Sequence, residues 1–176
     1  SLEGIETVLA DAGVNAAPKA SRAVLVGTAL SPGETKTKSD GTVARTIWGE
    51  MAWQLGGSEG YALVADSDKN GTAPGSDTLT NLFTAHSPCL ILIDEWVAYA
   101  RQLFDKTDLP AGTFDSQSSF AQSLTEAAKA APKCLVVASI PQSRIEIGGD
   151  NGIKVLDVLK NIFTRVAKPW RAATGD

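Results

Sequence analysis

The sequence predicts an α/β fold, a three-layer αβα arrangement in which helices cover both faces of a mostly parallel sheet. Two observations predict it. Three short runs rich in Val, Leu and Ile, at 23–30, 89–94 and 134–140, are typical of strands that are buried on both faces. Segments with a helical spacing of apolar residues separate these runs, and this alternation implies parallel strands joined by crossover helices.

The other elements follow from local patterns. Helices are predicted where apolar residues recur every three or four positions, at 3–12, 43–55, 58–66, 77–85, 95–104, 115–131 and 153–167. Polar segments rich in Gly, Pro, Asp and Asn are predicted as loops, at 31–40, 66–75 and 105–113. We expect two helices to end at glycines, one at Gly13 and one at the pair Gly56–Gly57. Ser76 is expected to cap the helix at 77–85. Residues 143–152 are expected to form a short strand or hairpin-like loop.

Length and composition indicate one soluble globular domain over residues 1–176. Apolar residues make up 43% and charged residues 20% of the chain, which is ordinary for such a domain. The net charge of −4 gives no support for nucleic-acid binding by this segment itself. The longest apolar runs are too short to cross a membrane, and no signal peptide is visible. We therefore expect a cytoplasmic protein, and we expect residues 1–2 to be a vector remnant.

The residues that most often bind metal or form disulfides are few. Cys89 and Cys134 each begin an apolar run, and we interpret them as buried strand thiols in a reducing cytoplasm. His86 is the only histidine, and no pair of cysteines has the spacing of metal ligands, so a zinc site is not expected.

The stretch CLILIDEW at 89–96 ends a predicted core strand with two adjacent carboxylates, Asp94 and Glu95. Burying a carboxylate without a partner is costly, so acids at the end of a core strand call for a reason. Four hydrophobic residues followed by Asp-Glu form the Walker B pattern of P-loop ATPases. In that interpretation Asp94 orients the water shell of the Mg²⁺ on ATP, and Glu95 is the general base that polarises the attacking water.

The next predicted strand ends in SIPQS, and polar groups at such a position often act as sensors of the γ-phosphate. Ser139 is the first candidate for this role, followed by Gln142 and Ser143. A structural interpretation of the acids stays open at this point. Asp94 could cap the helix at 95–104, with Glu95 in the first turn of that helix, where the helix dipole stabilises negative charge.

The sequence lacks the phosphate-binding loop G-x-x-x-x-G-K-[ST] that accompanies Walker B. GTALSPGET at 27–35 has the wrong glycine spacing and Glu34 in place of the lysine, and GTAPGSDT at 71–78 has the wrong spacing. In P-loop ATPases this loop precedes Walker B. We therefore expect a fragment of a larger ATPase that begins downstream of the loop and is inactive alone.

Longer stretches resemble a known family. TIWGEMAWQLGG at 46–57 and LIDEWVAYARQL at 92–103, together with AVLVGTAL and CLVVASIPQS, resemble the AAA+-like region of the bacterial family called domain of unknown function 499. Its members are large proteins with predicted ATP-binding regions, often encoded beside methyltransferases and helicases in phage-defence loci. The resemblance covers nearly the whole chain. It implies a P-loop NTPase fold and ATP binding through a GKT loop upstream of this segment.

The resemblance also implies site residues and partners. The Walker B acids fall on Asp94 and Glu95, the sensor on Ser139 or Gln142, and Arg144, Arg165 and Arg171 are candidate phosphate-sensing or intersubunit arginines. Gln142 and Arg144 are expected to contact the nucleotide. The parent would couple ATP hydrolysis to remodelling of DNA or a protein partner, either as an oligomer or as a single copy.

Two other functions stay open. The chain could be a non-catalytic α/β binding or scaffolding module in which Asp94 only caps a helix. It could instead be a different enzyme, such as a Mg²⁺-dependent nuclease that adds Asp66, Asp68 or Asp77 to the two acids. A serine hydrolase is disfavoured because no G-x-S-x-G elbow appears. A sheet that lacks its first strand would have an open edge, which predicts self-association of the isolated chain.

Overall fold

The computed structural model describes residues 4–141 and 149–164. It confirms the α/β class and the parallel sheet. The three strands of this sheet are β1 (Ser21–Val26), β4 (Cys89–Asp94) and β5 (Cys134–Ala138). They run parallel in the order β1-β4-β5, so the strand that ends in Asp94 lies in the middle.

The first strand ends earlier than the pattern predicted, at Val26 instead of residue 30. The N–H of Gly27 still donates to the Asp94 carbonyl at 2.8 Å. The N–H of Ala29 donates to the carbonyl of Val26 at 2.9 Å, which closes a turn. The chain therefore leaves the sheet directly after Gly27, and Thr28 lies just beyond the strand.

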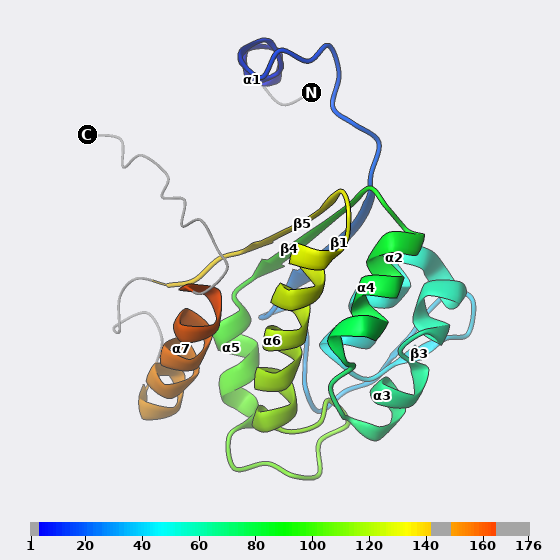
Figure 1. Ribbon diagram of the computed structural model, residues 1–176. Coiled ribbons are helices and arrows are strands. Elements are labelled where there is room, and N and C mark those ends of the chain that lie inside the picture. The colour runs from blue at the N-terminus through cyan, green and yellow to red at the C-terminus, as the bar shows by residue number, and fades with distance from the viewer. Residues whose placement is uncertain (1–3, 142–148, 165–176) are drawn as a thin grey trace.

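The prediction of three layers is not met among the described residues, because helices cover only one face of the sheet (Figure 1). Inward-facing residues such as Ala23, Leu25, Ile91 and Ile93 are at most 2% exposed. On the other face, Val24 pairs in register with Leu92, and Leu92 with Val137. We call this side the open face.

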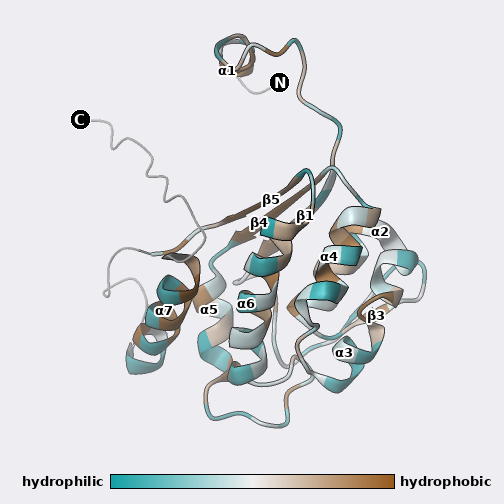
Figure 2. Cartoon of the chain, viewed as in Figure 1, coloured by the Kyte–Doolittle hydropathy of each residue, from teal (hydrophilic) through white to brown (hydrophobic). Residues whose placement is uncertain are grey.

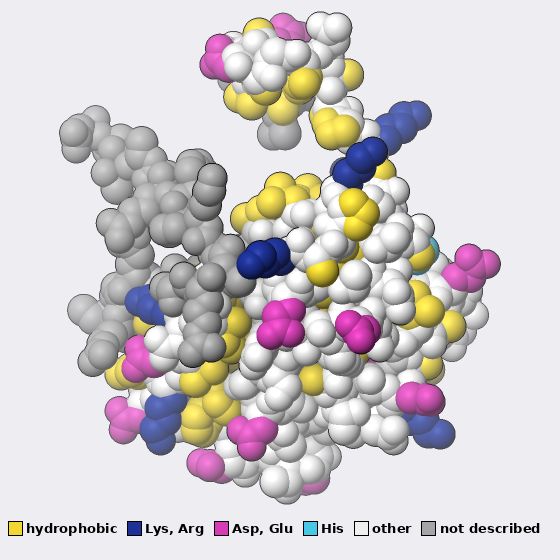
Figure 3. Space-filling view, viewed as in Figure 1, with side chains coloured by type: hydrophobic (Ala, Val, Ile, Leu, Met, Phe, Trp, Pro, Cys, Tyr) yellow, Lys and Arg dark blue, Asp and Glu magenta, His cyan; other side chains and the backbone are white. Residues whose placement is uncertain are grey.

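The open face is apolar although it is exposed. Val24 is 50%, Leu135 59% and Val137 46% exposed. Figure 2 shows the strands as a hydrophobic layer, and Figure 3 shows hydrophobic side chains gathered over the sheet. The continuous apolar runs that predicted two-sided burial are thus present, but the described residues provide a covering layer on one side only.

The helix α2 (Ile47–Ala62) begins at Thr46, whose hydroxyl accepts the N–H of Gly49 at 3.0 Å, and it is broken by non-helical angles at Gly56 and Gly57. The predicted interruption at this glycine pair is confirmed. Before the break, Gln54 covers the outer edge of β1. Its Oε1 accepts the N–H of Val24 at 2.7 Å, and its Nε2 donates to the carbonyl of Val24 at 3.1 Å.

The predicted loop at 66–75 instead contains the helix α3 (Ala65–Asn70). The cause is Asp68, which is 0% exposed. Its carboxylate accepts the N–H groups of Arg45 and Thr46 at 3.0 and 2.9 Å, the Thr46 hydroxyl at 2.6 Å and the Tyr61 hydroxyl at 2.7 Å. Asp68 therefore ties α3 to the start of α2.

The predicted cap of the next helix is also wrong. The N-cap of α4 (Ser76–Ala85) is Gly75, and Ser76 is the first helical residue. The remaining elements are α1 (Ile5–Asp11), β2 (Lys36–Thr37), β3 (Val43–Ala44), α5 (Trp96–Ala100), the 3₁₀ helix η1 (Arg101–Leu103), α6 (Phe114–Ala130) and α7 (Gly149–Thr164). The strands β2 and β3 pair as a small antiparallel ribbon, and α1 lies apart from the rest (Figure 1).

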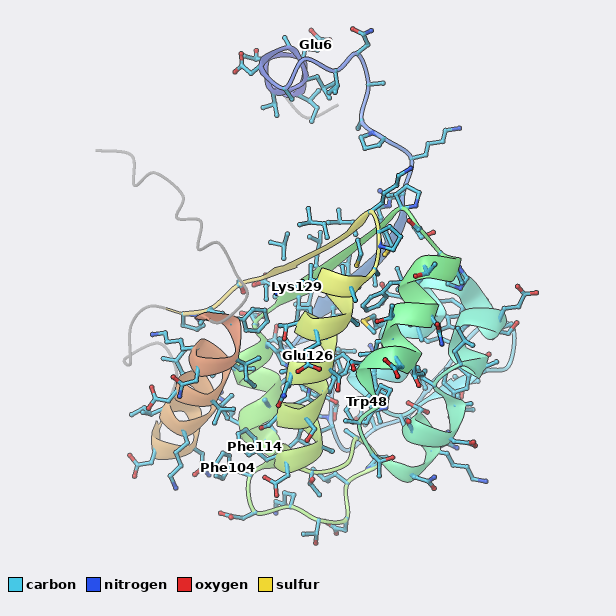
Figure 4. All side chains as sticks on the ribbon, viewed as in Figure 1. Glu6, Trp48, Phe104, Phe114, Glu126 and Lys129 are labelled. Carbon is cyan, nitrogen blue, oxygen red and sulfur yellow. The ribbon has the colours of Figure 1, made fainter. Side chains whose placement is uncertain are left out.

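Aromatic residues join the helices beneath the sheet. The Phe120 ring of α6 lies 5.4 Å from Trp48 of α2 and 5.9 Å from Trp96 of α5, measured between centroids. Trp48 and Trp96 are 0% and 1% exposed. At the far ends of the helices, Phe104 and Phe114 lie against each other at 4.4 Å (Figure 4). This packing holds α5, and therefore the residues before it, in a fixed position.

None of the helices in the described part of the chain is long and apolar enough to cross a membrane.

Candidate functional site

Polar side chains from three strand ends meet at the carboxyl edge of the sheet. Asp94 ends β4, Ser139 directly follows β5, and Thr28 lies two residues beyond β1. Because parallel strands end at the same edge, this is where α/β proteins usually place their functional groups. The structure therefore brings the predicted residues Asp94, Glu95 and Ser139 together with Thr28.

Asp94 and Ser139 form the centre of this site. The Ser139 hydroxyl donates to Asp94 Oδ1 at 2.5 Å, and the backbone N–H of Glu95 donates to the same oxygen at 2.9 Å and lies 3.2 Å from Ser139 Oγ. The Ser139 N–H is itself fixed by the Ile93 carbonyl at 2.9 Å. One carboxylate oxygen is thus held in place, while Oδ2 has no hydrogen-bond partner among the described residues.

Glu95 has a left-handed backbone conformation, with φ of 52°. This conformation is uncommon for a residue other than glycine and is often found at functional sites. It turns the chain sharply from β4 into α5. The Glu95 carbonyl accepts the N–H groups of Ala98 and Tyr99 at 3.0 and 3.3 Å, and the side chain accepts a hydrogen bond from the Thr28 hydroxyl.

The helix-cap interpretation of Asp94 is not supported by this geometry. The N-cap of α5 is Glu95, whose side chain makes no capping hydrogen bond. The Asp94 carboxylate bonds the N–H of Glu95, which precedes the first helical residue, instead of an N–H within the first turn. Both carboxylates belong to exposed residues. Neither therefore serves as the hydrogen-bond partner of a polar group buried in the core.

Gly27 lets β1 approach this turn closely. A Cβ on Gly27 would lie 2.0 Å from the Glu95 carbonyl oxygen and 2.7 Å from its carbon, and 3.2 Å from the Tyr99 Cβ. These contacts leave no room for a side chain. Beneath them Tyr99 is 2% exposed, and its burial raises the pKa of its hydroxyl. Gly27 was not singled out as a site residue from sequence, although it follows the first strand in the run AVLVGTAL.

The other predicted residues either lie outside the described part of the chain or lie elsewhere in the fold. Gln142, Arg144, Arg165 and Arg171 lie outside the described residues. Asp68 is used by the buried network that anchors α2, and Asp66 and Asp77 lie in the first turns of α3 and α4. Within residues 4–141 and 149–164, no group of three or more His, Cys, Asp or Glu side chains could hold a metal ion by itself.

The chemistry of the cluster suits a hydrated hard cation. Its groups are carboxylate and hydroxyl oxygens, which are the ligands that Mg²⁺ prefers, and Mg²⁺ usually keeps several waters and takes only one or two carboxylates from the protein. Asp94, with one fixed oxygen and one that no described residue bonds, fits this requirement. A metal would be held here only together with other oxygens, such as those of phosphates.

Comparison with known proteins supports the family resemblance, at the level of the DUF499 family. No curated protein and no solved structure matches the chain. The sequence profile of the DUF499 N-terminal domain matches residues 17–169, which include every strand of the parallel sheet and all the residues of the cluster. The chain therefore belongs to the DUF499 family.

Proposed function

We propose that the cluster at the carboxyl edge of the sheet is the acidic half of a Mg²⁺–ATP site in an AAA+-like P-loop ATPase. The observation that carries this proposal is the arrangement of Asp94, Glu95 and Ser139. Two exposed carboxylates follow a buried central strand, and a hydroxyl from the next strand touches the first of them. Bound Mg²⁺ would supply charge neutralisation of the phosphate oxygens.

Asp94 is suited to orient the water shell of the cation. Ser139 and the Glu95 N–H bond the same carboxylate oxygen, so the side chain is held in one orientation before the ligand arrives. Such preorganisation reduces the cost of ordering on binding. Ser139 lies beside the same group from β5, where it could also respond to the terminal phosphate.

Glu95 is suited to act as general base. Its left-handed backbone, with φ of 52°, directs the residue out of the strand at the sheet edge. Its carboxylate bonds the Thr28 hydroxyl, which gives it a resting position over the end of β1. In the proposed mechanism Glu95 accepts a proton from the attacking water. Thr28 is a positioning residue that fixes the Glu95 carboxylate before the reaction.

The phosphate-binding half of the proposed site would come from outside this segment. We propose that it lies beside the edge of β5 that faces away from β4. Among the described residues no strand pairs with β5 on the side away from β4, whereas Gln54 occupies the outer edge of β1. A strand added beside β5 would end next to Ser139. A helix following that strand could cover the open face, whose Val24, Leu135 and Val137 are about half exposed. The family's GKT loop between such a strand and helix would then face Asp94.

A Glu95→Gln change tests the proposal in the longer protein that carries the GKT loop. The variant should bind ATP with unchanged affinity and lose hydrolysis by roughly a hundredfold or more, since general-base catalysis contributes about 10²–10⁴-fold. Glu59→Gln, on an exposed residue of α2, is the matched control and should hydrolyse ATP normally. Normal turnover by Glu95→Gln would exclude the general-base role.

A further inference from the structure

The two cysteines of the chain lie next to each other at the edge of the sheet opposite the acidic cluster. Cys89 begins β4 and Cys134 begins β5, and their Cα atoms are partners in the parallel register. Adjacent strands are about 4.8 Å apart, and Cα atoms joined by a disulfide are usually about 4.4–6.8 Å apart. The backbone therefore already has a spacing that a disulfide can bridge.

Both side chains point to the same face. Cys89 is 3% exposed and belongs to the core, and Cys134 packs against that core while its neighbour Leu135 is 59% exposed. The two thiols affect each other's pKa. A hydrogen bond from the Cys134 thiol lowers the pKa of Cys89, and the same contact raises the pKa of Cys134. Neither cysteine is in a disulfide.

From this geometry we propose that Cys89 and Cys134 form a dithiol site, which a peroxide closes into an intramolecular disulfide and which a trivalent arsenical bridges. In the oxidation, the thiolate of one cysteine attacks a peroxide oxygen and becomes a sulfenic acid as hydroxide leaves and takes up the released proton as water. The second thiol then attacks that sulfur, forms the S–S bond and releases a second water. Two thiols are oxidised, and one peroxide is reduced to two waters.

The site is independent of the proposed ATP chemistry. Cys89 and Asp94 are the first and last residues of β4, so the dithiol lies at the opposite end of the strand. Partial exposure of Cys134 gives a small oxidant access to one sulfur. The cis Ser87–Pro88 peptide precedes Cys89, and Lys133, which has a left-handed backbone conformation, precedes Cys134. The Cys89 N–H donates to the Lys133 carbonyl at 3.0 Å, and this hydrogen bond holds the two strand starts together.

Treatment of the folded, reduced chain with hydrogen peroxide tests the proposal. We expect an intact mass lower by two hydrogens, no free thiol after denaturation in the absence of reductant, and a Cys89–Cys134 linked peptide. Phenylarsine oxide should bind at one equivalent and resist competition by a monothiol. Cys89→Ser and Cys134→Ser should each abolish the intramolecular disulfide and weaken arsenical binding by roughly tenfold or more, because one thiol cannot bridge.

Two results would overturn the proposal. Persistence of both thiols in the folded wild-type chain at peroxide concentrations that oxidise a solvent-exposed thiol would show that the pair cannot close. A disulfide that forms only between chains, or only after unfolding, would show that register alone does not bring the sulfurs within reach. Both readouts use the wild-type chain, so they decide the question even where a serine variant fails to fold.

Discussion

Substitution of Gly27 by alanine tests the geometry of the acidic cluster most sharply. The Cβ of alanine would lie 2.0 Å from the Glu95 carbonyl oxygen and 2.7 Å from its carbon. Both atoms belong to the backbone of the turn between β4 and α5, so no side-chain rotation can relieve the overlap. Either β1 moves away from β4 and weakens the bond from the Gly27 N–H to the Asp94 carbonyl, or the Glu95 turn shifts.

The size of the effect follows from the cost of overpacking. Inserting a methyl group into a filled site costs about 1–3 kcal/mol, and the upper part of that range applies because the clash is with backbone. For a chain of this length, each kcal/mol lowers Tm by about 2–4 °C. We therefore expect Gly27→Ala to lose about 2–3 kcal/mol in urea unfolding and to melt roughly 4–12 °C earlier.

Gly33→Ala is the matched control, because a Cβ there meets nothing nearer than the Ser31 Oγ at 3.9 Å. Its stability should stay within about 0.5 kcal/mol of the wild type. Equal stability of the Gly27 and Gly33 variants would refute the close approach of β1 to Glu95. It would also remove the basis for placing Thr28 beside the Glu95 carboxylate.

Three further predictions concern other parts of the fold. Burial and the Asp68 carboxylate raise the pKa of Tyr61 to about 12, so the contribution of the neutral hydroxyl to stability is complete below about pH 10 and is lost as the pH rises towards 12. Chemical unfolding across this range should show a decline in stability that is smaller in Tyr61→Phe, where the buried Tyr99 still contributes to it. A decline of unchanged size in Tyr61→Phe would contradict the Asp68 contact. Gln117 is 1% exposed, and neither its Oε1 nor its Nε2 has a hydrogen-bond partner among the described residues. Gln117→Met should therefore raise the free energy of unfolding by about 1 kcal/mol, whereas a loss of that size would mean that the amide is bonded. The exposed apolar side chains of Leu135 and Val137 predict that the isolated chain self-associates as its concentration rises. Sedimentation should show weaker self-association when both residues are changed to lysine. A wild-type chain that is monomeric at all concentrations would contradict this use of the open face.

The residues that sequence reasoning found are those whose signal is local. Asp94 and Glu95 follow an apolar run directly, and Ser139 follows the next one, so the rule that parallel strands end at one edge was enough to predict their meeting. The pair Gly56–Gly57 likewise interrupts its helix without help from the rest of the fold.

The features that sequence reasoning missed depend on contacts between distant segments. Residues 66–70 have loop-like composition, but the bonds of Asp68 to Arg45, Thr46 and Tyr61 stabilise a helix there. Thr28 and Glu95 are 67 positions apart, and no local pattern links them. The apolar run predicts that the first strand continues through Gly27. The close approach of Gly27 to the Glu95 carbonyl, which requires a glycine, is visible only in three dimensions.

The prediction of helices on both faces was wrong for the described residues for a different reason. Val24, Leu92 and Val137 are as apolar as the residues on the covered face, so the strands have the composition of a sheet buried on both sides. Composition reports what a strand can be packed against. It does not report whether the covering element lies within the described chain.

The proposed ATP site is best tested by calorimetric titration with Mg²⁺–ATP, carried out on this chain and on a longer one that includes the GKT loop proposed to lie upstream. We expect that only the longer chain binds, and that Asp94→Asn weakens its binding of Mg²⁺–ATP while leaving the fold intact. Absence of binding by both chains would contradict an ATP site at the Asp94 edge of the sheet.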